Sequence, residues 1–326
     1  MTRALLLGVL LLLAAGCSRA PSTPAKPGER PLVKVTLQTD FYAQAEHGGF
    51  YQALLKGFYR EEGLDVKIIQ GGPMAPVGLN LATGIVQFSI GRSDDAIISV
   101  SHDIPFVVIA AMMQNDPQAL MVHRESPVRK FEDLNGRVVM TNPGAAWASY
   151  LMQTHHMKFY IMPMNYGMAQ FMADPGFIQQ CFATNEPFYV EQNGQHARVL
   201  MISDGGYDPY RVILANADYA AKHPDVARAF ARASIRGWED YLHGDPSLAN
   251  AEIGKLNLQM TPPFLAYAIQ AMKDYKLVEG DPAKGQGMGL ISRKRMQRLI
   301  DILDSLKMLD RKVTVDEVVT SDYLRP

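Results

Sequence analysis

The segment from residue 40 to residue 49 carries much of the chemistry that the chain offers to a bound molecule. It combines two aromatic rings with two carboxyl groups and one imidazole: Asp40, Phe41, Tyr42, Glu46 and His47. Aromatic faces can stack on a flat ring, and carboxylates accept hydrogen bonds from ligand amines. The segment therefore indicates a site for a planar, amine-bearing molecule, with ordinary core packing of the rings as the other interpretation.

Five side chains elsewhere are candidates to complete such a site: Arg92, Asn142, Trp147, Asn185 and Glu186. Glu186 can accept from ligand amines, and Arg92 can pair with a carboxylate, sulfonate or phosphate. Trp147 can face Tyr42 across a ligand, although its apolar neighbours make core packing an equal alternative. Single charged residues are usually solvated surface, which is the competing interpretation for Arg92 and Glu186.

Motifs of catalysis and metal binding do not occur in the sequence. It contains no Gly-x-x-x-x-Gly-Lys, no His-Glu-x-x-His and no Gly-x-Ser-x-Gly. His155 and His156 are adjacent, so on a helix their side chains diverge by about 100 degrees and cannot coordinate the same metal ion. Cys181 is predicted to be a small buried residue. We therefore expect a protein that binds no cofactor and no metal and is not an enzyme.

The elements that must position these residues alternate between strand and helix. Strand patterns cover residues 32–38, 65–70, 86–90, 106–112, 120–123, 137–140, 158–162, 197–202 and 211–215. Helix patterns cover residues 48–62, 145–155, 224–242, 262–275 and 292–309, with Thr261 and Ser292 as N-caps of the last two. This order predicts an α/β fold with mostly parallel sheets, whose ligand lies beyond the carboxyl ends of the strands. Asp40, Arg92 and Asn142 fall at such ends.

The amino terminus has the features of an export signal. Residues 1–16 contain Arg3, an apolar run from Ala4 to Ala15 and small residues before Cys17. The run is too short to cross a bilayer, and the segment ending at Cys17 resembles the lipobox of bacterial lipoproteins, with Ala14 where Leu is usual. The resemblance implies acylation of Cys17; a plain cleaved signal is the alternative. Residues 17–31 are polar and proline-rich, which predicts an extended tether.

The order of features from residue 38 to residue 69 resembles a family of substrate-binding proteins. The matching pieces are Asp40-Phe41-Tyr42, the run from Glu46 to Tyr51, Lys56-Gly57-Phe58-Tyr59 and the run from Glu62 to Val66; the segments 131–138 and 184–188 agree as well. The family includes pyrimidine-precursor, sulfonate, taurine and nitrate binders, and is named for thiamine-pyrimidine synthesis and sulfonate uptake. Residues 160–174 and 177–183 depart from its pattern where the second lobe would meet the ligand.

The resemblance implies a two-lobed, type II periplasmic-binding-protein-like fold, each lobe a central, mostly parallel sheet flanked by helices. Lobe I would comprise residues 32–113 and 209–326, and lobe II residues 114–208. It also implies a component of an ABC importer, with a permease and an ATPase as partners. Together with the amino terminus, this predicts an exported protein anchored to a membrane through lipid, and we expect a monomer.

We expect the ligand to be a small planar nitrogen heterocycle, related to a thiamine pyrimidine or a flavin. The alternatives are a sulfonate, nitrate or carboxylate anion, held by Arg92, and a pyrimidine-synthesising enzyme that uses His47. Nucleic acid is excluded as a partner because 32 basic and 33 acidic side chains nearly cancel.

Overall fold

The computed structural model describes residues 31–320. The predicted signal peptide, Cys17 and all but the last residue of the tether therefore lie outside the described residues. None of the helices between residues 31 and 320 is long and apolar enough to span a membrane.

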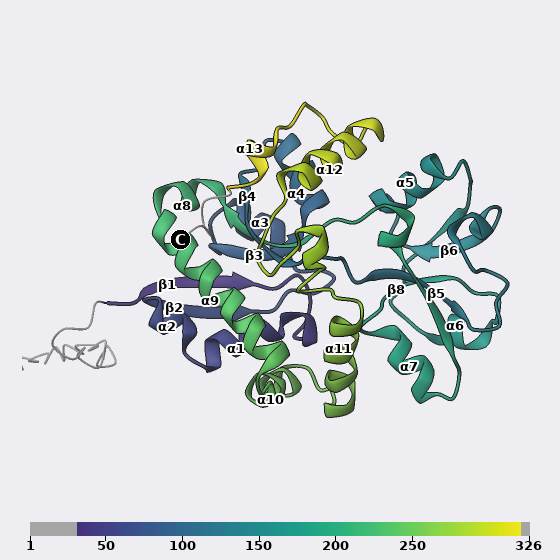
Figure 1. Ribbon diagram of the computed structural model, residues 1–326, viewed down its shortest axis with the longest axis horizontal. Coiled ribbons are helices and arrows are strands. Elements are labelled where there is room, and N and C mark those ends of the chain that lie inside the picture. Colours follow the sequence, from purple (N-terminus) through teal and green to yellow (C-terminus); the bar gives the residue numbers. More distant parts are fainter. Residues whose placement is uncertain (1–30, 321–326) are drawn as a thin grey trace, which may run out of the picture. The chain divides into compact units, whose positions relative to one another are not determined.

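Within residues 31–320 the strands form two five-stranded sheets (Figure 1). The first has the order β2-β1-β3-β10-β4. Its strands are β1 (Val33–Gln38), β2 (Leu64–Ile69), β3 (Phe88–Arg92), β4 (Phe106–Met113) and β10 (Arg211–Asn216). The pairs β1–β2 and β1–β3 are parallel, whereas β10 runs antiparallel to both β3 and β4. β4 is buried along its whole length, as expected for a strand covered on both faces.

The second sheet repeats this arrangement with the order β7-β6-β8-β5-β9. Its strands are β5 (Gln118–His123), β6 (Val138–Thr141), β7 (Tyr160–Pro163), β8 (Gln179–Phe182) and β9 (Ala197–Met201). Here β5 is the antiparallel member, paired with β8 and β9, while β6 is parallel to β7 and β8. The predicted α/β class with two mostly parallel sheets is confirmed.

Helices cover both faces of the first sheet. One face carries α1 (Gly48–Leu55) and α9 (Pro224–His243), and the other carries α4 (Ser93–Ser101) and α12 (Arg293–Ser305). The remaining helices of this half are α2 (Phe58–Glu61), α3 (Val77–Ala82), α8 (Ala217–Lys222), α10 (Ser247–Leu256), α11 (Pro262–Asp274) and α13 (Val315–Val318). The second sheet carries α5 (Ala146–Thr154), α6 (Ala169–Ala173) and α7 (Glu186–Gln192). Short 3-10 turns lie at Ala45–His47 (η1), Phe131–Leu134 (η2), Ile202–Gly205 (η3) and Pro282–Lys284 (η4).

Glycines let α1 and α9 approach closely, and this contact holds the loop that precedes α1. A Cβ atom on Gly237 would lie 2.2 Å from the carbonyl oxygen of Gly49, and one on Gly49 would lie 2.3 Å from the ring of Trp238. Either clash would push the helices apart. The segment before α1, which contains the candidate ligand-binding residues, is thus anchored by the core.

Two local predictions are corrected, and one strand was missed. The helix predicted for residues 48–62 is two helices, because Gly57 adopts the left-handed conformation (φ 80°) between α1 and α2. Strand β8 was not predicted, since its sequence Gln-Gln-Cys-Phe carries no apolar alternation although the strand is central. Thr261 precedes α11 but its side chain makes no capping hydrogen bond, whereas Ser292 accepts one from the N–H of Arg295.

Candidate functional site

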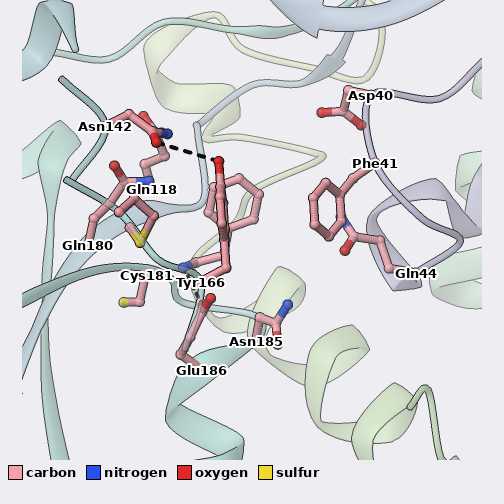
Figure 2. Close-up of a pocket in the computed structure, with 12 residues that line it drawn as sticks. Asp40, Phe41, Gln44, Gln118, Asn142, Tyr166, Gln180, Cys181, Asn185 and Glu186 are labelled. Carbon is pink, nitrogen blue, oxygen red and sulfur yellow. Dashed lines mark hydrogen bonds between the residues drawn. The ribbon is translucent and has the colours of Figure 1, made fainter. Parts of the chain in front are cut away.

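A cavity of about 170 Å³ lies between the two sheets (Figure 2). One side comes from the loop after β1, and the other from β5, β8 and the loops that follow β6, β7 and β8. The lining residues are Asp40, Phe41, Gln44, Gln118, Asn142, Met164, Tyr166, Gln180, Cys181, Phe182, Asn185 and Glu186. The carboxyl ends of β1 and β6 therefore meet at one site, as the α/β topology predicts.

Two aromatic rings face each other across this cavity. Phe41 belongs to the first half and Tyr166 to the second, and their ring centroids lie 6.4 Å apart with an interplanar angle of 32°. Tyr166 is 62% exposed, and its φ of 58° is rare for a residue other than glycine. Its hydroxyl lies 3.5 Å from Oδ1 of Asn142 (Figure 2). Tyr42 is half exposed and packs its ring edge-on against Phe41.

Carboxamides supply much of the polar lining. Gln180 accepts a hydrogen bond from the Thr141 hydroxyl (2.6 Å), and Gln118 accepts one from Arg92 (2.7 Å). Both bonds use the amide oxygen, so each amide nitrogen is left as a donor. Gln44, Asn142 and Asn185 line the same cavity. Among the described residues, no Lys or Arg lines this cavity.

Glu186 is the carboxyl group at the base of the cavity. Its Oε2 accepts a hydrogen bond from the backbone N–H of Phe182 (2.7 Å). Burial raises the pKa of Glu186 to about 7, because desolvation outweighs that hydrogen bond, and the nearby Glu46 adds to the rise. Near neutral pH Glu186 can therefore either accept or donate a hydrogen bond. Burial also raises the pKa of the Cys181 thiol, which disfavours the thiolate.

Asp40 is held in its ionised form by two partners. Its Oδ1 lies 2.9 Å from Nε2 of His47, and its Oδ2 accepts a hydrogen bond from Arg211. Burial alone would raise the pKa of Asp40, but the Arg211 guanidinium and the His47 bond outweigh it and keep the pKa below its usual range. His47 itself is fully buried, does not line the cavity, and leaves its Nδ1 without a partner.

Glu46 also lies behind the cavity wall, where it joins the two halves. One carboxyl oxygen accepts a hydrogen bond from the hydroxyl of Thr184, and the other has no partner. The side chain is buried, and this burial raises its pKa. Nearby, the Tyr267 hydroxyl of α11 donates to the Ala183 carbonyl (2.9 Å), and the Phe188 and Phe264 rings meet edge-on. The contact at Thr184 is therefore part of a larger interface.

Arg92 and Trp147 do not line the cavity, although Arg92 donates a hydrogen bond to Gln118, which does. The guanidinium of Arg92 makes two 3.1 Å bonds to Asp95 and lies 3.2 Å from Asp94. Trp147 is fully buried in the core and stacks near Phe159, with centroids 6.2 Å apart. The geometry thus favours core packing for Trp147, because α5 turns this face inward.

The ten predicted residues therefore divide evenly. Those that line the cavity are Asp40, Phe41, Asn142, Asn185 and Glu186. Those that do not are Tyr42, Glu46, His47, Arg92 and Trp147. Sequence reasoning missed Gln44, Gln118, Met164, Tyr166, Gln180, Cys181 and Phe182 as lining residues. The unusual segments 160–174 and 177–183 were the available signal, since they contain five of these seven. Within residues 31–320, no group of three or more His, Cys, Asp or Glu side chains is placed to hold a metal ion.

Comparisons with known proteins agree with this architecture. The family model described as "NMT1/THI5 like" matches residues 44–249, more than half of the chain. The chain is 24% identical to the riboflavin-binding protein RibY of Chloroflexus aurantiacus, covering 99% of this chain and 97% of that protein. It is 25% identical to the formylaminopyrimidine-binding protein of Halalkalibacterium halodurans, covering 72% of each. The structure superposes on the alkanesulfonate-binding protein SsuA of Xanthomonas axonopodis pv. citri with a TM-score of 0.65 and 12% identity, over 90% of this chain and 99% of that one. The predicted periplasmic-binding-protein-like fold is thereby confirmed.

Proposed function

The chain belongs to the NMT1/THI5-like family, and we propose that it is the solute-binding component of an ABC importer that captures a small planar nitrogen heterocycle between its two halves. The observation that carries the proposal is the pair of facing rings, Phe41 and Tyr166, in a cavity that no Lys or Arg of the described chain lines. Relatives that bind riboflavin and formylaminopyrimidine support the same ligand class.

The spacing of the two rings suits one inserted ring. Carbon atoms in contact lie about 3.5 Å apart, so a ring sandwiched between two others needs about 7 Å between them. The centroids of Phe41 and Tyr166 are already 6.4 Å apart. A small movement of the exposed Tyr166 would bring the pair to that distance and reduce their 32° tilt.

The edge of the ligand would meet amides and a carboxyl group. Heterocycles such as pyrimidines and flavins present alternating N–H, C=O and ring-nitrogen groups at their edges. Carboxamides can both donate and accept, so Gln44, Gln118 and Gln180 can match such an edge. Glu186 adds an acceptor for a ring N–H or an amine when it is ionised.

An anion is the weaker candidate. A sulfonate or nitrate carries a negative charge, which a cation without a carboxylate partner would best balance. The guanidiniums that lie nearest in the fold are already paired, Arg92 with Asp94 and Asp95 and Arg211 with Asp40. The carboxylates of the lining would repel a further negative charge.

An enzyme that synthesises a pyrimidine is likewise a weaker candidate than a solute-binding protein. A histidine that is consumed in a reaction must reach the reacting molecule, whereas His47 is fully buried and points at Asp40. The Cys181 thiol is disfavoured as a nucleophile by its raised pKa. Capture without reaction therefore fits the site better.

The proposal includes how the protein moves and where it works. Residues 32–113 and 209–326 would form one lobe and residues 114–208 the other. The crossings between β4 and β5 and between η3 and β10 would serve as the hinge. Export through the signal at residues 1–16 and acylation of Cys17 would place the lobes beside a membrane-bound permease and ATPase.

A ligand screen tests the proposal. Thermal unfolding should be followed with pyrimidines, flavins, alkanesulfonates and nitrate, since a ligand at 100 times its Kd adds about 2.7 kcal/mol of stability. We expect stabilisation by a heterocycle and none by the anions. Phe41→Ala should weaken heterocycle binding about 5- to 100-fold, the loss expected for one stacking partner. Tyr160→Ala, which removes an exposed ring outside the cavity, is the matched control. Stabilisation by anions alone would contradict the proposal.

A further inference from the structure

Two amides of the second half line the cavity that contains Phe41 and Tyr166, which we call the ring cavity. Gln118 is the first residue of β5, and Gln180 lies on β8 (Figure 2). In the antiparallel pair Gln118 is opposite Phe182, and Gln180 precedes Phe182 by two residues. All three side chains therefore project from the same face of the sheet, where the two amides can meet one edge of a bound molecule together.

The orientation of the Gln118 amide is set by Arg92. Nη1 of Arg92 donates a hydrogen bond to Oε1 of Gln118 at 2.7 Å. A guanidinium has five N–H donors and no acceptor, so the atom of Gln118 that faces it must be the amide oxygen. Turning the amide over would bring two donors together and lose the bond. The NH2 group of Gln118 therefore points away from Arg92, and it donates to no other group within residues 31–320.

Arg92 is itself held in one orientation. Its Nε and Nη2 each donate to one oxygen of Asp95 at 3.1 Å, and Asp94 lies 3.2 Å from Nε. This side-on pairing uses one edge of the planar guanidinium and leaves Nη1 for Gln118. Asp94 is buried and accepts a hydrogen bond from the Tyr207 hydroxyl (2.7 Å). The donor that faces Gln118 is therefore fixed on two sides.

Gln180 has the same orientation as Gln118. The Thr141 hydroxyl donates to Oε1 of Gln180 (2.6 Å), which leaves the NH2 group of Gln180 as a donor. Strands β5 and β8 therefore present N–H groups to the ring cavity, and we call this surface of Gln118 and Gln180 the donor side. The carboxyl group of Glu186 lies elsewhere, at the start of α7, where it can still accept from a ring N–H.

We propose that Arg92 is a positioning residue for ligand selection: it fixes the Gln118 amide so that the donor side takes ring carbonyls or unprotonated ring nitrogens and rejects amino groups. This inference rests on the proposed function and narrows its ligand to heterocycles with acceptors along one edge. An amino group there would face N–H groups and leave donors of both molecules unpaired. Arg92 would thus act on the ligand through Gln118 and not by pairing with a charged group of the ligand.

The test compares two planar, fluorescent ligands of the same size. Lumazine carries carbonyl groups at positions 2 and 4 of the pteridine ring, and 2,4-diaminopteridine carries amino groups there. Their affinities for the folded protein are measured by fluorescence titration at pH 7. We expect lumazine to bind at least about tenfold more tightly, because the N–H groups of the donor side have no acceptor in the diamino complex.

Variants of Arg92 separate positioning from a purely structural role. Arg92→Gln removes the donor-only group and lets the Gln118 amide turn over. The ratio of the two affinities should then fall about three- to tenfold, mainly through tighter binding of the diamino compound. A loss of structural support alone would weaken both ligands alike and leave the ratio unchanged. Arg92→Lys, whose ammonium also only donates, should keep most of the wild-type ratio.

A matched control and a second variant complete the design. Asp95→Asn removes a charge beside Arg92 but not the bond from Arg92 to Gln118, so it should keep the wild-type ratio. Gln118→Glu keeps the size of the side chain and its ability to accept from Arg92, but it has no NH2 group. It should reverse the preference, so that 2,4-diaminopteridine binds more tightly than lumazine. This variant decides the question if Arg92→Gln does not fold.

The outcomes separate the two proposals. Equal affinity of the wild type for the two pteridines, an unchanged ratio in folded Arg92→Gln, or a wild-type ratio in Gln118→Glu would overturn the role of Arg92 while the heterocycle site stands. Binding of other heterocycles without any binding of lumazine would do the same. Failure of every heterocycle to bind would instead refute the proposed function itself.

Discussion

Glu186→Gln should change how the stability of the protein depends on pH. The carboxyl group lies at the base of the ring cavity, and burial raises its pKa from 4.5 to about 7. Glutamine keeps the shape and can still accept the N–H of Phe182. The substitution therefore removes the titration without removing the hydrogen bond.

The size and sign of the effect follow from the two pKa values. Below about pH 4.5 the carboxyl group is protonated in both folded and unfolded chains and has no pH-dependent effect. Between pH 4.5 and about 7 the unfolded chain loses this proton first, so the wild-type protein loses stability as pH rises; above pH 7 the loss is constant. The full shift corresponds to roughly 3 kcal/mol, which partial exposure of the side chain reduces to about 1–3 kcal/mol.

The measurement is urea unfolding of both proteins at pH 4.5, 6 and 8. The free energy of unfolding of Glu186→Gln minus that of the wild type should increase by about 1–3 kcal/mol from pH 4.5 to pH 8. Other buried carboxyl groups with raised pKa values, including Glu46 and Asp94, cancel to first order in this difference. Glu125→Gln, at an exposed position in the same half, should give no such increase. Parallel pH profiles for Glu186→Gln and the wild type would refute the reasoning.

Three further predictions concern the core, the interface between the halves and the membrane anchor. Trp147→Ala should lower the free energy of unfolding by about 3–5 kcal/mol, because it removes a fully buried ring. At temperatures below the unfolding transition, its affinity for the heterocycle should be unchanged. A loss of affinity in the folded variant would show that Trp147 contributes to ligand binding. Thr184→Val should cost about 1–3 kcal/mol, because it leaves Glu46 buried without its donor, and should increase the radius of gyration in X-ray scattering, whereas Thr83→Val at an exposed position should do neither. An unchanged radius would show that this bond does not hold the halves together. Cys17→Ser should move the protein from the membrane fraction to the soluble fraction of cells, and its persistence in the membrane fraction would rule out acylation at that residue as the anchor.

The architecture was largely predictable because it depends on local patterns. Alternating apolar residues mark β1 and the apolar run from Phe106 marks β4, and both strands form where these patterns place them. The helix pattern from Pro224 likewise predicts α9. Strand β8 was not predicted from the sequence because its burial depends on its neighbours in the sheet rather than on an apolar pattern of its own residues.

Part of the site was predictable for a topological reason. Loops that follow strands of an α/β sheet meet at one edge, so Asp40, Phe41 and Asn142 could be assigned to a common site from their positions alone. Glu186 was identified through its place beside a turn that resembles the family pattern.

The rest of the site was decided by tertiary structure. Gln118 and Gln180 lie on central strands, and their sequence cannot tell which end or face of a sheet meets the opposite half. Glu46 accepts a hydrogen bond from Thr184, which lies 138 residues away along the chain. His47 is buried against Asp40 instead of facing the cavity. The sequence by itself determined which elements form and which loops gather at the sheet edges, because those depend on residues close together in the chain. Only tertiary packing, of α5 on its own sheet and of one half against the other, decided that Tyr166 rather than Trp147 faces Phe41, because that choice depends on contacts between segments that no local pattern connects.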